Sequence, residues 1–459
     1  MTSPAWVEHA FVYHLFPLGV CGAPWTNHDP ETVPRLYKLN DWIEPAQRIG
    51  ANTVLWGPIW ESESHGYDTR IYGQLDHRLG TNDDLKAVVR QWKDQGFRVL
   101  FDGVFNHCGR GFAPFEDLRS NGNQSPYRDW FAGVDFSQSN SLGDPFSYEG
   151  WNGHLALVKF NLKNPEVRRF LFEQVSAWMD EYGLDGLRLD AADVMDLDFL
   201  RALSEHCLSK NQEFWLLGEV IHGDYRDWAP GAGLHAVTNY ELFKGLWSSH
   251  NDSNYFEAAW TLNRQFGPEG LYRGQLFSTF GDNHDVDRAA STLTNPAHLY
   301  PHAILCAAVP GVPTVYYGSE AGLEGKKTST GDEPLRPALS PDALTALPHT
   351  ALRGLWAQLA ELRRQFSALR TGGYRQALAA SKQFAFFRET QQEVLLIAVN
   401  SASESVTVRI SLPESCYLGR WDDVLNPGAS FETQRNEVEL VLHPFWGRIL
   451  KFANESQPH

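Results

Sequence analysis

The feature that most constrains the fold of this chain is a regular alternation of short apolar runs with amphipathic helical patterns. This alternation is typical of βαβ units, in which each helix returns the chain so that successive strands run parallel. Eight such strands in one chain predict the α/β class and, within it, a (β/α)8 TIM barrel. The strands are predicted at residues 11–16, 53–56, 99–104, 186–190, 215–220, 236–238, 277–280 and 314–317.

Helical patterns fall between these runs. At the start of one of them, Asn164 precedes Pro165. This pair favours a helix start, because Asn caps free backbone N–H groups and Pro is tolerated at the first helical position. The helices are predicted over residues 83–95, 165–181, 197–208 and 301–308.

Four of the predicted strands end in acidic or histidine side chains. The carboxyl ends of all strands in a (β/α)8 barrel converge on one face, and catalytic residues come from several of them. The sequence therefore predicts one pocket that holds three carboxylates and two imidazoles, which suits the cleavage of glycosidic bonds. The four stretches run from Asp102 to His107, from Gly186 to Asp190, from Gly218 to Val220 and from Phe280 to Asp285.

Arg188 and Asp190 lie two residues apart in one of these strands. Alternate side chains of a strand point to the same face, so we expect the two to be presented together. A neighbouring guanidinium favours the charged form of a carboxyl group. We therefore expect Arg188 to hold Asp190 ionised and to orient it.

Each of these residues has a structural alternative. A single Asp at a strand end caps a helix or forms an ion pair at least as often as it catalyses a reaction. The functional interpretation rests on the set, because the residues follow strands three, four, five and seven in order.

Two regions depart from the alternating pattern. Residues 108–162 are rich in Gly, Asn, Ser and aromatics, and we see no helical period in them; loops of this length are usually functional. After residue 369 short strands are predicted at 384–388, 394–400, 406–410 and 448–452, which indicates an antiparallel β-sandwich. We therefore divide the chain into a barrel (1–107 and 163–372), an inserted domain (108–162) and a C-terminal domain (373–459).

Composition excludes several classes of partner. The net charge of −17 argues against nucleic acid and against an anionic membrane surface. The aromatic content of 13%, with 16 Trp, suits stacking on sugar rings, although most of these rings are expected in the core. The five Cys have neither disulfide nor zinc spacing, and neither a signal peptide nor a membrane span is visible, so we expect a reducing, cytoplasmic setting.

The four stretches, in this order, resemble the signature regions of the α-amylase superfamily of glycoside hydrolases. The resemblance implies that Asp190 is the nucleophile and Glu219 the general acid and base. It further implies that Asp285 is a third carboxylate that stabilises the transition state, and that His107 and His284 bind the sugar.

Flanking stretches extend the resemblance. His65 to Asp68 resembles the segment after strand two, in which Tyr67 would stack on the sugar and Asp68 would brace the site. The stretch that follows strand eight resembles the region whose acidic and basic residues, here Asp332 and Arg336, grip the next glucose. A surface salt bridge is the alternative for this last pair.

Residues 157–161 resemble the fifth signature region of cyclomaltodextrinases, maltogenic amylases and neopullulanases, with Lys159 and Asn161 kept. This implies cleavage of α-1,4 and sometimes α-1,6 bonds in small cyclic or linear α-glucans, cyclic maltosyl-maltose included. The sequence departs from this group in two places. Strand one begins by residue 11, whereas most of that group carry a further β domain before the barrel. Ile221 and His222 follow the stretch that contains Glu219, where an aromatic residue is common in the group.

Three alternatives stay open. The enzyme could be an α-glucosidase, or a transglycosylase or isomerase that acts on malto-oligosaccharides, and the remote alternative is a non-catalytic carbohydrate-binding relative. We predict no cofactor and no metal. Asn106 matches a calcium ligand of many α-amylases, but its side chain could equally form a hydrogen bond to the backbone. The expected partner is an α-glucan oligosaccharide, with no nucleic acid and no membrane, and a homodimer is a candidate assembly.

Overall fold

The computed structural model describes residues 3–329 and 331–454. Its centre is a closed barrel of eight parallel strands, which closes because the last strand pairs with the first. Every predicted barrel strand is present, so the predicted (β/α)8 barrel is confirmed. The strands are β1 (Val12–Leu15), β2 (Thr53–Trp56), β5 (Arg98–Gly103), β9 (Gly186–Leu189), β10 (Trp215–Gly218), β11 (Ala236–Thr238), β12 (Leu276–Phe280) and β13 (Val312–Tyr316).

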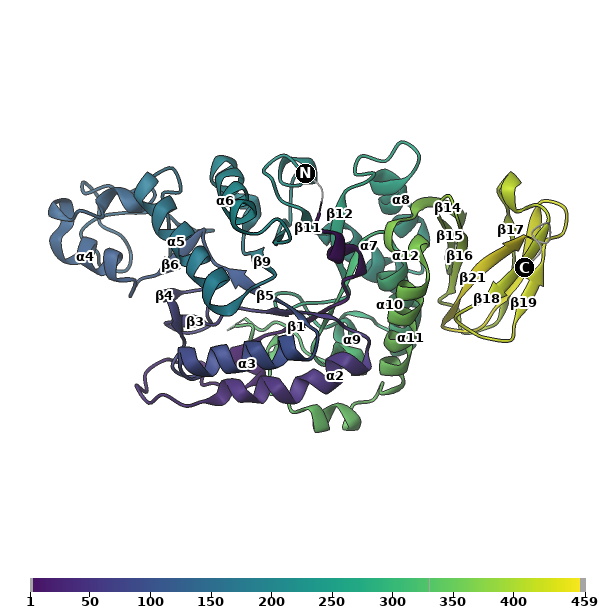
Figure 1. Ribbon diagram of the computed structural model, residues 1–459, viewed down its shortest axis with the longest axis horizontal. Coiled ribbons are helices and arrows are strands. Elements are labelled where there is room, and N and C mark those ends of the chain that lie inside the picture. The colour runs from purple at the N-terminus through teal and green to yellow at the C-terminus, as the bar shows by residue number, and fades with distance from the viewer. Residues whose placement is uncertain (1–2, 330, 455–459) are drawn as a thin grey trace.

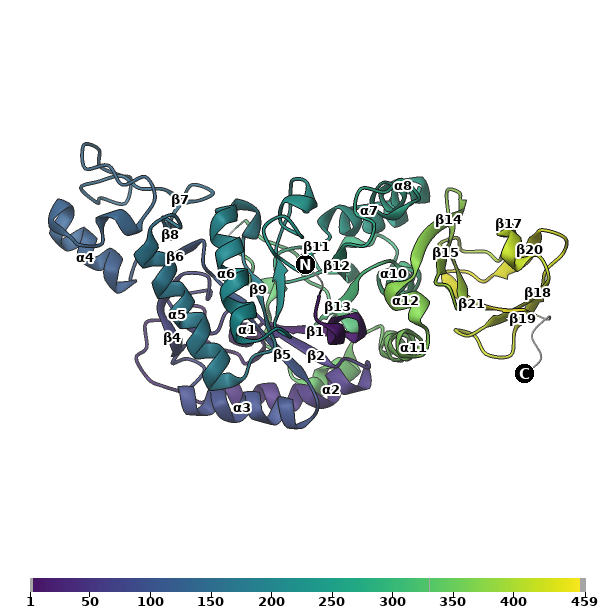
Figure 2. The ribbon, with the colours of Figure 1, turned by 45° about the horizontal axis from the view of Figure 1, so that its top comes forward.

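Helices surround this barrel (Figure 1 and Figure 2). All four predicted helices are present, with bounds within two residues of those expected, as α3, α5, α6 and α10. The helices outside the insertion are α1 (Pro17–Val20), α2 (Ile43–Arg48), α3 (Asn82–Asp94), α5 (Pro165–Tyr182), α6 (Leu197–Lys210), α7 (Tyr240–Asn251), α8 (Tyr255–Phe266), α9 (Ala289–Thr292), α10 (Leu299–Ala308), α11 (Ala351–Gln365) and α12 (Ser367–Thr371).

Local sequence explains where these helices begin and end. The Asn164 side chain accepts hydrogen bonds from the backbone N–H groups of Glu166 and Val167, which confirms the predicted cap of α5. The same helix ends at Gly183, whose φ of 60° lies in the left-handed region that glycine adopts at little cost. Its buried Trp178 stacks on Trp60 with ring centroids 4.6 Å apart, so α5 is fixed against the barrel.

The inserted segment is more ordered than its sequence indicates. It contains a three-stranded sheet and a helix, α4, so the prediction of no helical period here was wrong. The helix is short, and only Phe115 and Leu118 form its buried face. Two apolar residues three apart are too weak a signal to stand out. The elements are β6 (His107–Gly109), β7 (Gly150–Trp151), β8 (His154–Lys159) and α4 (Ala113–Asn121).

The C-terminal domain is an antiparallel sandwich, as predicted. A six-stranded sheet faces a two-stranded one, and side chains of both, such as Phe387 and Ile410, share one buried cluster. Half of its strands went unpredicted, because they are short or alternate with charged residues. The strands are β14 (Gly373–Ala379), β15 (Gln383–Glu389), β16 (Val394–Asn400), β17 (Val406–Ser411), β18 (Gly419–Asp423), β19 (Ser430–Glu432), β20 (Glu437–Leu442) and β21 (Trp446–Asn454).

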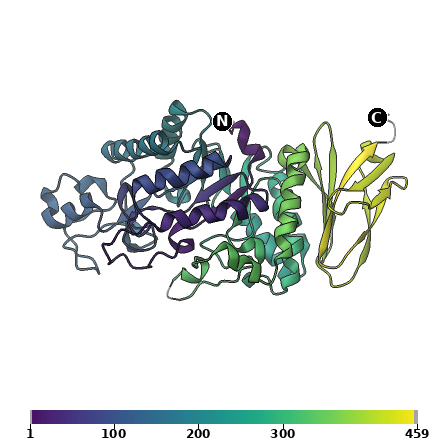
Figure 3. The same cartoon turned by 60° about the horizontal axis from the view of Figure 1, so that its bottom comes forward.

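The insertion and the C-terminal domain lie at opposite ends of the molecule, with the barrel between them (Figure 1 and Figure 3). Among the described helices, none is both long and apolar enough to cross a membrane.

Candidate active site

The carboxyl ends of β5, β9 and β10 place four polar side chains next to one another. Asp102 on β5 is in register with Arg188 on β9. Asp190 directly follows β9, and Glu219 directly follows β10, where its backbone N–H donates to the Leu189 carbonyl at 2.9 Å. Because all the strands are parallel, these side chains emerge on the same face of the barrel.

The guanidinium of Arg188 is the centre of this group. Its Nη1 lies 2.6 Å from Asp102 Oδ2 and 3.2 Å from Asp190 Oδ1, and its Nη2 lies 2.6 Å from Glu219 Oε1. Arg188 is only 3% exposed, so all three ion pairs are shielded from water. The predicted contact between Arg188 and Asp190 is therefore present, and Arg188 also joins Asp190 to Glu219.

A chain of contacts leads from this group to the end of β12. Tyr67, in the loop between β3 (Trp60–Ser62) and β4 (Thr69–Leu75), donates to Asp102 Oδ2 at 2.9 Å and contacts His284 Nε2. His284 in turn lies 2.9 Å from Asp285 Oδ2, and Arg336 Nη2 lies 2.8 Å from Asp285 Oδ1.

The predicted pair of Asp332 and Arg336 is in contact, at 3.1 Å. Arg336 is 4% exposed and shares its Nη2 between Asp332 and Asp285. A surface salt bridge therefore does not describe this pair. Arg336 instead connects Asp332 to the carboxylate at the end of β12.

Two of the predicted site residues have no hydrogen bond to these carboxylates. Asp68 is buried and accepts from Ser64 Oγ at 2.5 Å. His107, at the start of β6, interacts through Nδ1 with Asn106 Nδ2 at 3.2 Å. Burial, followed by the nearby His65, lowers the pKa of His107 to about 4, so its imidazole is neutral at physiological pH.

Sequence reasoning missed three residues of the site. Asp102 stands in the first of the quoted stretches but was given no role. Tyr240, the first residue of α7, donates to Glu219 Oε1 at 3.2 Å and accepts from Asn283 Nδ2 at 2.9 Å. Asn283 Oδ1 also accepts from the backbone N–H of Asp285 at 2.8 Å. Tyr240 follows β11, so the strand-end rule could have found it, although an aromatic residue there is usually read as core.

The pKa of Asp285 is shifted in the opposite direction from the pKa values of Asp190 and Glu219. Burial raises the pKa of Asp190 and Glu219 above their usual values; Asp190 is raised further by Glu219, and Arg188 opposes the shift in both. Burial also acts on Asp285, but His284 and Arg336 outweigh it and hold its pKa well below the usual value. Burial and neighbouring carboxylates therefore favour the protonated form at Asp190 and Glu219, whereas His284 and Arg336 favour the ionised form at Asp285. Arg188 lowers the pKa of Asp190, in the direction that we expected, but burial and Glu219 outweigh it.

Asn106, for which a calcium ligand and a backbone hydrogen bond were the two alternatives, is buried and contacts His107. The Oδ1 atom of Asn106 is buried and has no partner among the described residues. The only described trio of acidic or histidine side chains with converging ligand atoms is Glu61, Asp76 and His77. Its carboxylates are already engaged, Glu61 by Arg70 and His77, and Asp76 by Arg78 at 2.6 Å.

Comparisons with known proteins agree with this geometry. The sequence model of the protein family described as the α-amylase catalytic domain matches residues 36–340 of this chain. The chain is 30% identical to a cyclomaltodextrinase from Bacillus sp, over 88% of this chain and 75% of that protein. It is 29% identical to neopullulanase 2 of Thermoactinomyces vulgaris, over 98% and 78%. The solved structure of the cyclic α-maltosyl-(1→6)-maltose hydrolase from Arthrobacter globiformis superposes with a TM-score of 0.80 and 25% identity, over 98% of this chain and all of that one.

Proposed function

The chain belongs to the α-amylase family of glycoside hydrolases, and from this premise we propose how its site works and on what. We propose a retaining hydrolase that cleaves α-1,4 bonds, and α-1,6 bonds where the substrate offers them, in small cyclic or linear α-glucans. The observation that carries this proposal is the buried guanidinium of Arg188, which holds the carboxyls of Asp190 and Glu219 side by side.

Retaining hydrolysis proceeds by two displacements. In the first, Asp190 attacks the anomeric carbon while Glu219 gives its proton to the glycosidic oxygen, so the aglycone leaves with that proton. In the second, Glu219 takes a proton from water as the water attacks the same carbon and releases Asp190. In the reactive form of this mechanism Glu219 carries a proton and Asp190 is ionised.

The remaining residues position the sugar. We assign to Asp285 the binding of sugar hydroxyls and the stabilisation of positive charge in the transition state. His284 and Tyr67, which are in contact with each other, complete this subsite together with His107 and Asp68. Asp332 and Arg336 serve the neighbouring glucose.

The substrate class is inferred from the relatives and from the insertion. The relatives named above act on cyclodextrins, pullulan-type glucans and cyclic maltosyl-maltose, to judge by their names. Within the insertion, Lys159 on β8 is in register with His107 on β6. The segment that resembles the cyclomaltodextrinase-type region therefore adjoins a predicted sugar-binding histidine, which favours small glucans over long starch chains.

We further propose a cytoplasmic enzyme that needs no cofactor. All five cysteines are buried and free, as suits a reducing compartment. The proposed reaction moves protons and one glycosyl group through carboxyl groups alone. A homodimer is the proposed assembly, and sedimentation velocity tests it.

A time course of products tests the substrate class. γ-Cyclodextrin, pullulan, linear maltotetraose, soluble starch and cyclic maltosyl-maltose are incubated in parallel, and the sugars are separated at intervals. We expect one of the rings to open first, with starch nearly untouched. Faster consumption of starch or maltotetraose would instead support an α-amylase or α-glucosidase. Longer oligosaccharides that accumulate at high sugar concentration would support a transglycosylase.

A further inference from the structure

A second cavity, of about 720 Å³, lies at the opposite face of the barrel from the carboxylates. Its wall includes Leu276 and Gly311, at the amino ends of β12 and β13, and Gly373, where the C-terminal domain begins. No residue of the candidate active site lines it. The cavity is therefore a separate feature of the junction between the barrel and the C-terminal domain.

Arginines dominate the lining of this cavity. Four arginines line it, against two glutamates, Glu8 and Glu389. Of the four, only Arg375 has an ion-pair partner among the described residues, namely Glu389. The other three are Arg273, Arg370 and Arg388. An excess of positive charge in one cavity stands out in a protein whose net charge is −17.

The most buried of these side chains makes hydrogen bonds to backbone only. Arg388 is 1% exposed and donates to the carbonyls of Ala308, at 2.6 Å, and Gly372, at 3.2 and 2.9 Å. These bonds use three of its five N–H groups, so two remain. Arg370 donates through Nη1 to two carbonyls, and its Nε has no partner among the described residues.

A further arginine adds to the positive charge. Arg363, 4% exposed, lines a small adjoining cavity that Arg370 also lines, and it too donates only to carbonyls. Burial, with a smaller effect of Arg370, lowers the pKa of Arg363 to about 9. Burial, with a smaller effect of Arg363, likewise lowers the pKa of Arg388 to about 9. The carbonyls of Ala307, Ala308, Leu369 and Gly372 lie in or next to the last turns of α10 and α12, and a helix end carries only about half a negative charge. These partial charges do not neutralise the buried arginines, and buried charges in proteins are normally paired with an opposite charge.

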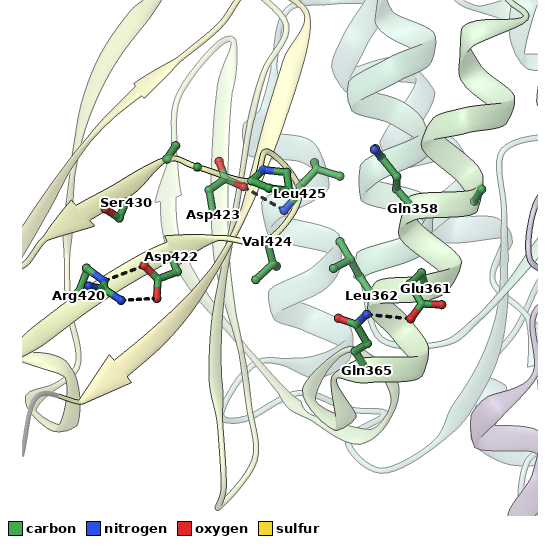
Figure 4. A pocket seen from close by; sticks show the side chains of 14 residues that line it. Gln358, Glu361, Leu362, Gln365, Arg420, Asp422, Asp423, Val424, Leu425 and Ser430 are labelled. Carbon is green, nitrogen blue, oxygen red and sulfur yellow. Dashed lines mark hydrogen bonds and ion pairs between the residues drawn. The ribbon is translucent and has the colours of Figure 1, made fainter. Parts of the chain in front are cut away.

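A neighbouring cavity provides a contrast. It measures about 900 Å³ and lies between α11 and the strands β18 and β19 (Figure 4). Its single arginine, Arg420, is held by Asp422 through two bonds, of 2.7 and 3.1 Å. The arginine of this cavity is therefore paired with a carboxylate, whereas three of the four arginines in the arginine-lined cavity have no ion-pair partner among the described residues.

We propose that the arginine-lined cavity binds a phosphate group, either as free phosphate or as the phosphate ester of a sugar. Arginine N–H groups match phosphate oxygens in geometry and charge. Arg273, which is exposed, and Arg370 would close on the oxyanion above the buried Arg388. The cavity exceeds the size of one phosphate, and Phe266 and Tyr374 give it an apolar wall on which a sugar ring could rest.

Isothermal titration calorimetry in a phosphate-free buffer of low ionic strength tests this proposal. The probes are inorganic phosphate and glucose 6-phosphate, with glucose as the uncharged control. We expect one saturable site per chain for at least one phosphate probe, weakened by salt, and no binding of glucose. Tighter binding of glucose 6-phosphate identifies an ester as the source, and equal or tighter binding of phosphate identifies the free ion.

Variants locate the site. Arg273→Gln alone should weaken binding several-fold, and Arg273→Gln with Arg370→Gln by at least about tenfold. The control, Arg90→Gln with Arg409→Gln, removes the same charge from two exposed arginines elsewhere and should bind like the wild type. The proposal is overturned if neither probe binds saturably, or if the Arg273 variant and the control behave alike. Because no glucan is present, this result does not depend on the proposed hydrolysis.

Discussion

At the scale of single residues, Arg188 organises the candidate active site. It bonds to Asp102, Asp190 and Glu219 from one buried position. Such a guanidinium lowers the cost of burying several carboxyls together, because each negative charge has a positive partner within hydrogen-bond distance. It also sets the relative positions of the two groups that exchange roles in the proposed reaction.

Tyr240 should tune the carboxyl of Glu219. Its hydroxyl donates to Glu219 Oε1 at 3.2 Å, and a donated hydrogen bond stabilises the ionised form. We predict that Tyr240→Phe raises the pKa of Glu219. The basic limb of the pH profile of kcat/KM then moves to higher pH by about one unit, because Glu219 keeps its proton to higher pH.

A matched variant separates this effect from a loss of packing. Tyr225→Phe removes a hydroxyl that contacts the backbone of Glu241 and lies outside the site. It should leave the pH profile in place. If Tyr240→Phe lowers kcat without moving the basic limb, then Tyr240 does not act through the proton of Glu219.

Glu320 should make the stability of the protein depend on pH. It is fully buried, Tyr13 donates to it at 2.6 Å, and burial raises its pKa from 4.5 to about 7. The folded state holds this proton more tightly than the unfolded state, so the stabilisation is complete below pH 4.5 and is lost as the pH rises to about 7. The loss has an upper bound on the order of 3 kcal/mol.

Glu320→Gln removes the titrating group and keeps an oxygen that can accept from Tyr13. We predict that the variant gains stability relative to the wild type between pH 5 and pH 8, as measured by urea unfolding at each pH. A difference in unfolding free energy that stays constant over this range would contradict the assigned cause.

At the scale of elements, the sequence predicted the barrel well, because each strand is a short apolar run bounded by polar residues. It predicted α5 almost to the residue, since Asn164 and Pro165 mark its start. It failed for α4, whose buried face has only two apolar residues. Here tertiary contacts, and not the local pattern, stabilise the helix.

The site was predictable to the extent that it depends on strand ends. Asp190 and Glu219 directly follow strands, so their convergence follows from the barrel alone. The strand-end rule could have given the positions of Asp102 and Tyr240, but it does not give their contacts with Arg188 and Glu219, which depend on which atoms face one another. The raised pKa of Asp190 could not be predicted either, because it results from burial next to Glu219.

The cap of α5 should be measurable on its own. Asn164→Ala removes the acceptor for the N–H groups of Glu166 and Val167, and also the bond from its Nδ2 to the Asp129 carbonyl in the insertion. We predict a loss of about 1 kcal/mol or slightly more in unfolding free energy. Asn123→Ala, at an exposed position, is the control. Equal stability of the two variants would show that Asn164 does not cap the helix.

At the scale of the whole molecule, the candidate active site and the arginine-lined cavity lie at opposite ends of the barrel. Carboxylates gather where the strands end, whereas the arginine-lined cavity lies where β12 and β13 begin. The insertion and the C-terminal domain extend the molecule in opposite directions (Figure 2). The proposed hydrolysis and the proposed phosphate site therefore occupy separate regions and can be tested separately.

The packing of the whole molecule predicts unreactive cysteines. All five are buried, and burial raises the pKa of Cys21 and Cys207 to about 12, so few thiolates form. A thiol reagent such as 5,5′-dithiobis(2-nitrobenzoic acid) should find almost no reactive thiol in the native protein at pH 8 and five in denaturant. Rapid reaction of any thiol in the native protein would contradict the packing described.

The central claim is that Asp190 and Glu219 divide the chemistry between them, and one kinetic comparison tests it most directly. Asp190→Asn and Glu219→Gln are assayed on a malto-oligosaccharide and on a 4-nitrophenyl maltoside, whose leaving group needs no proton. The control is Glu44→Gln, whose exposed carboxyl pairs with Arg48 on the same helix.

We predict that both variants lose about a thousandfold or more in kcat on the oligosaccharide, and that the control keeps its activity. On the nitrophenyl glycoside, Glu219→Gln should still release a burst of nitrophenol equal to the enzyme concentration, because Asp190 can attack without acid help. Asp190→Asn should release none. Wild-type turnover of the oligosaccharide by Glu219→Gln, or a burst from Asp190→Asn, would contradict the account.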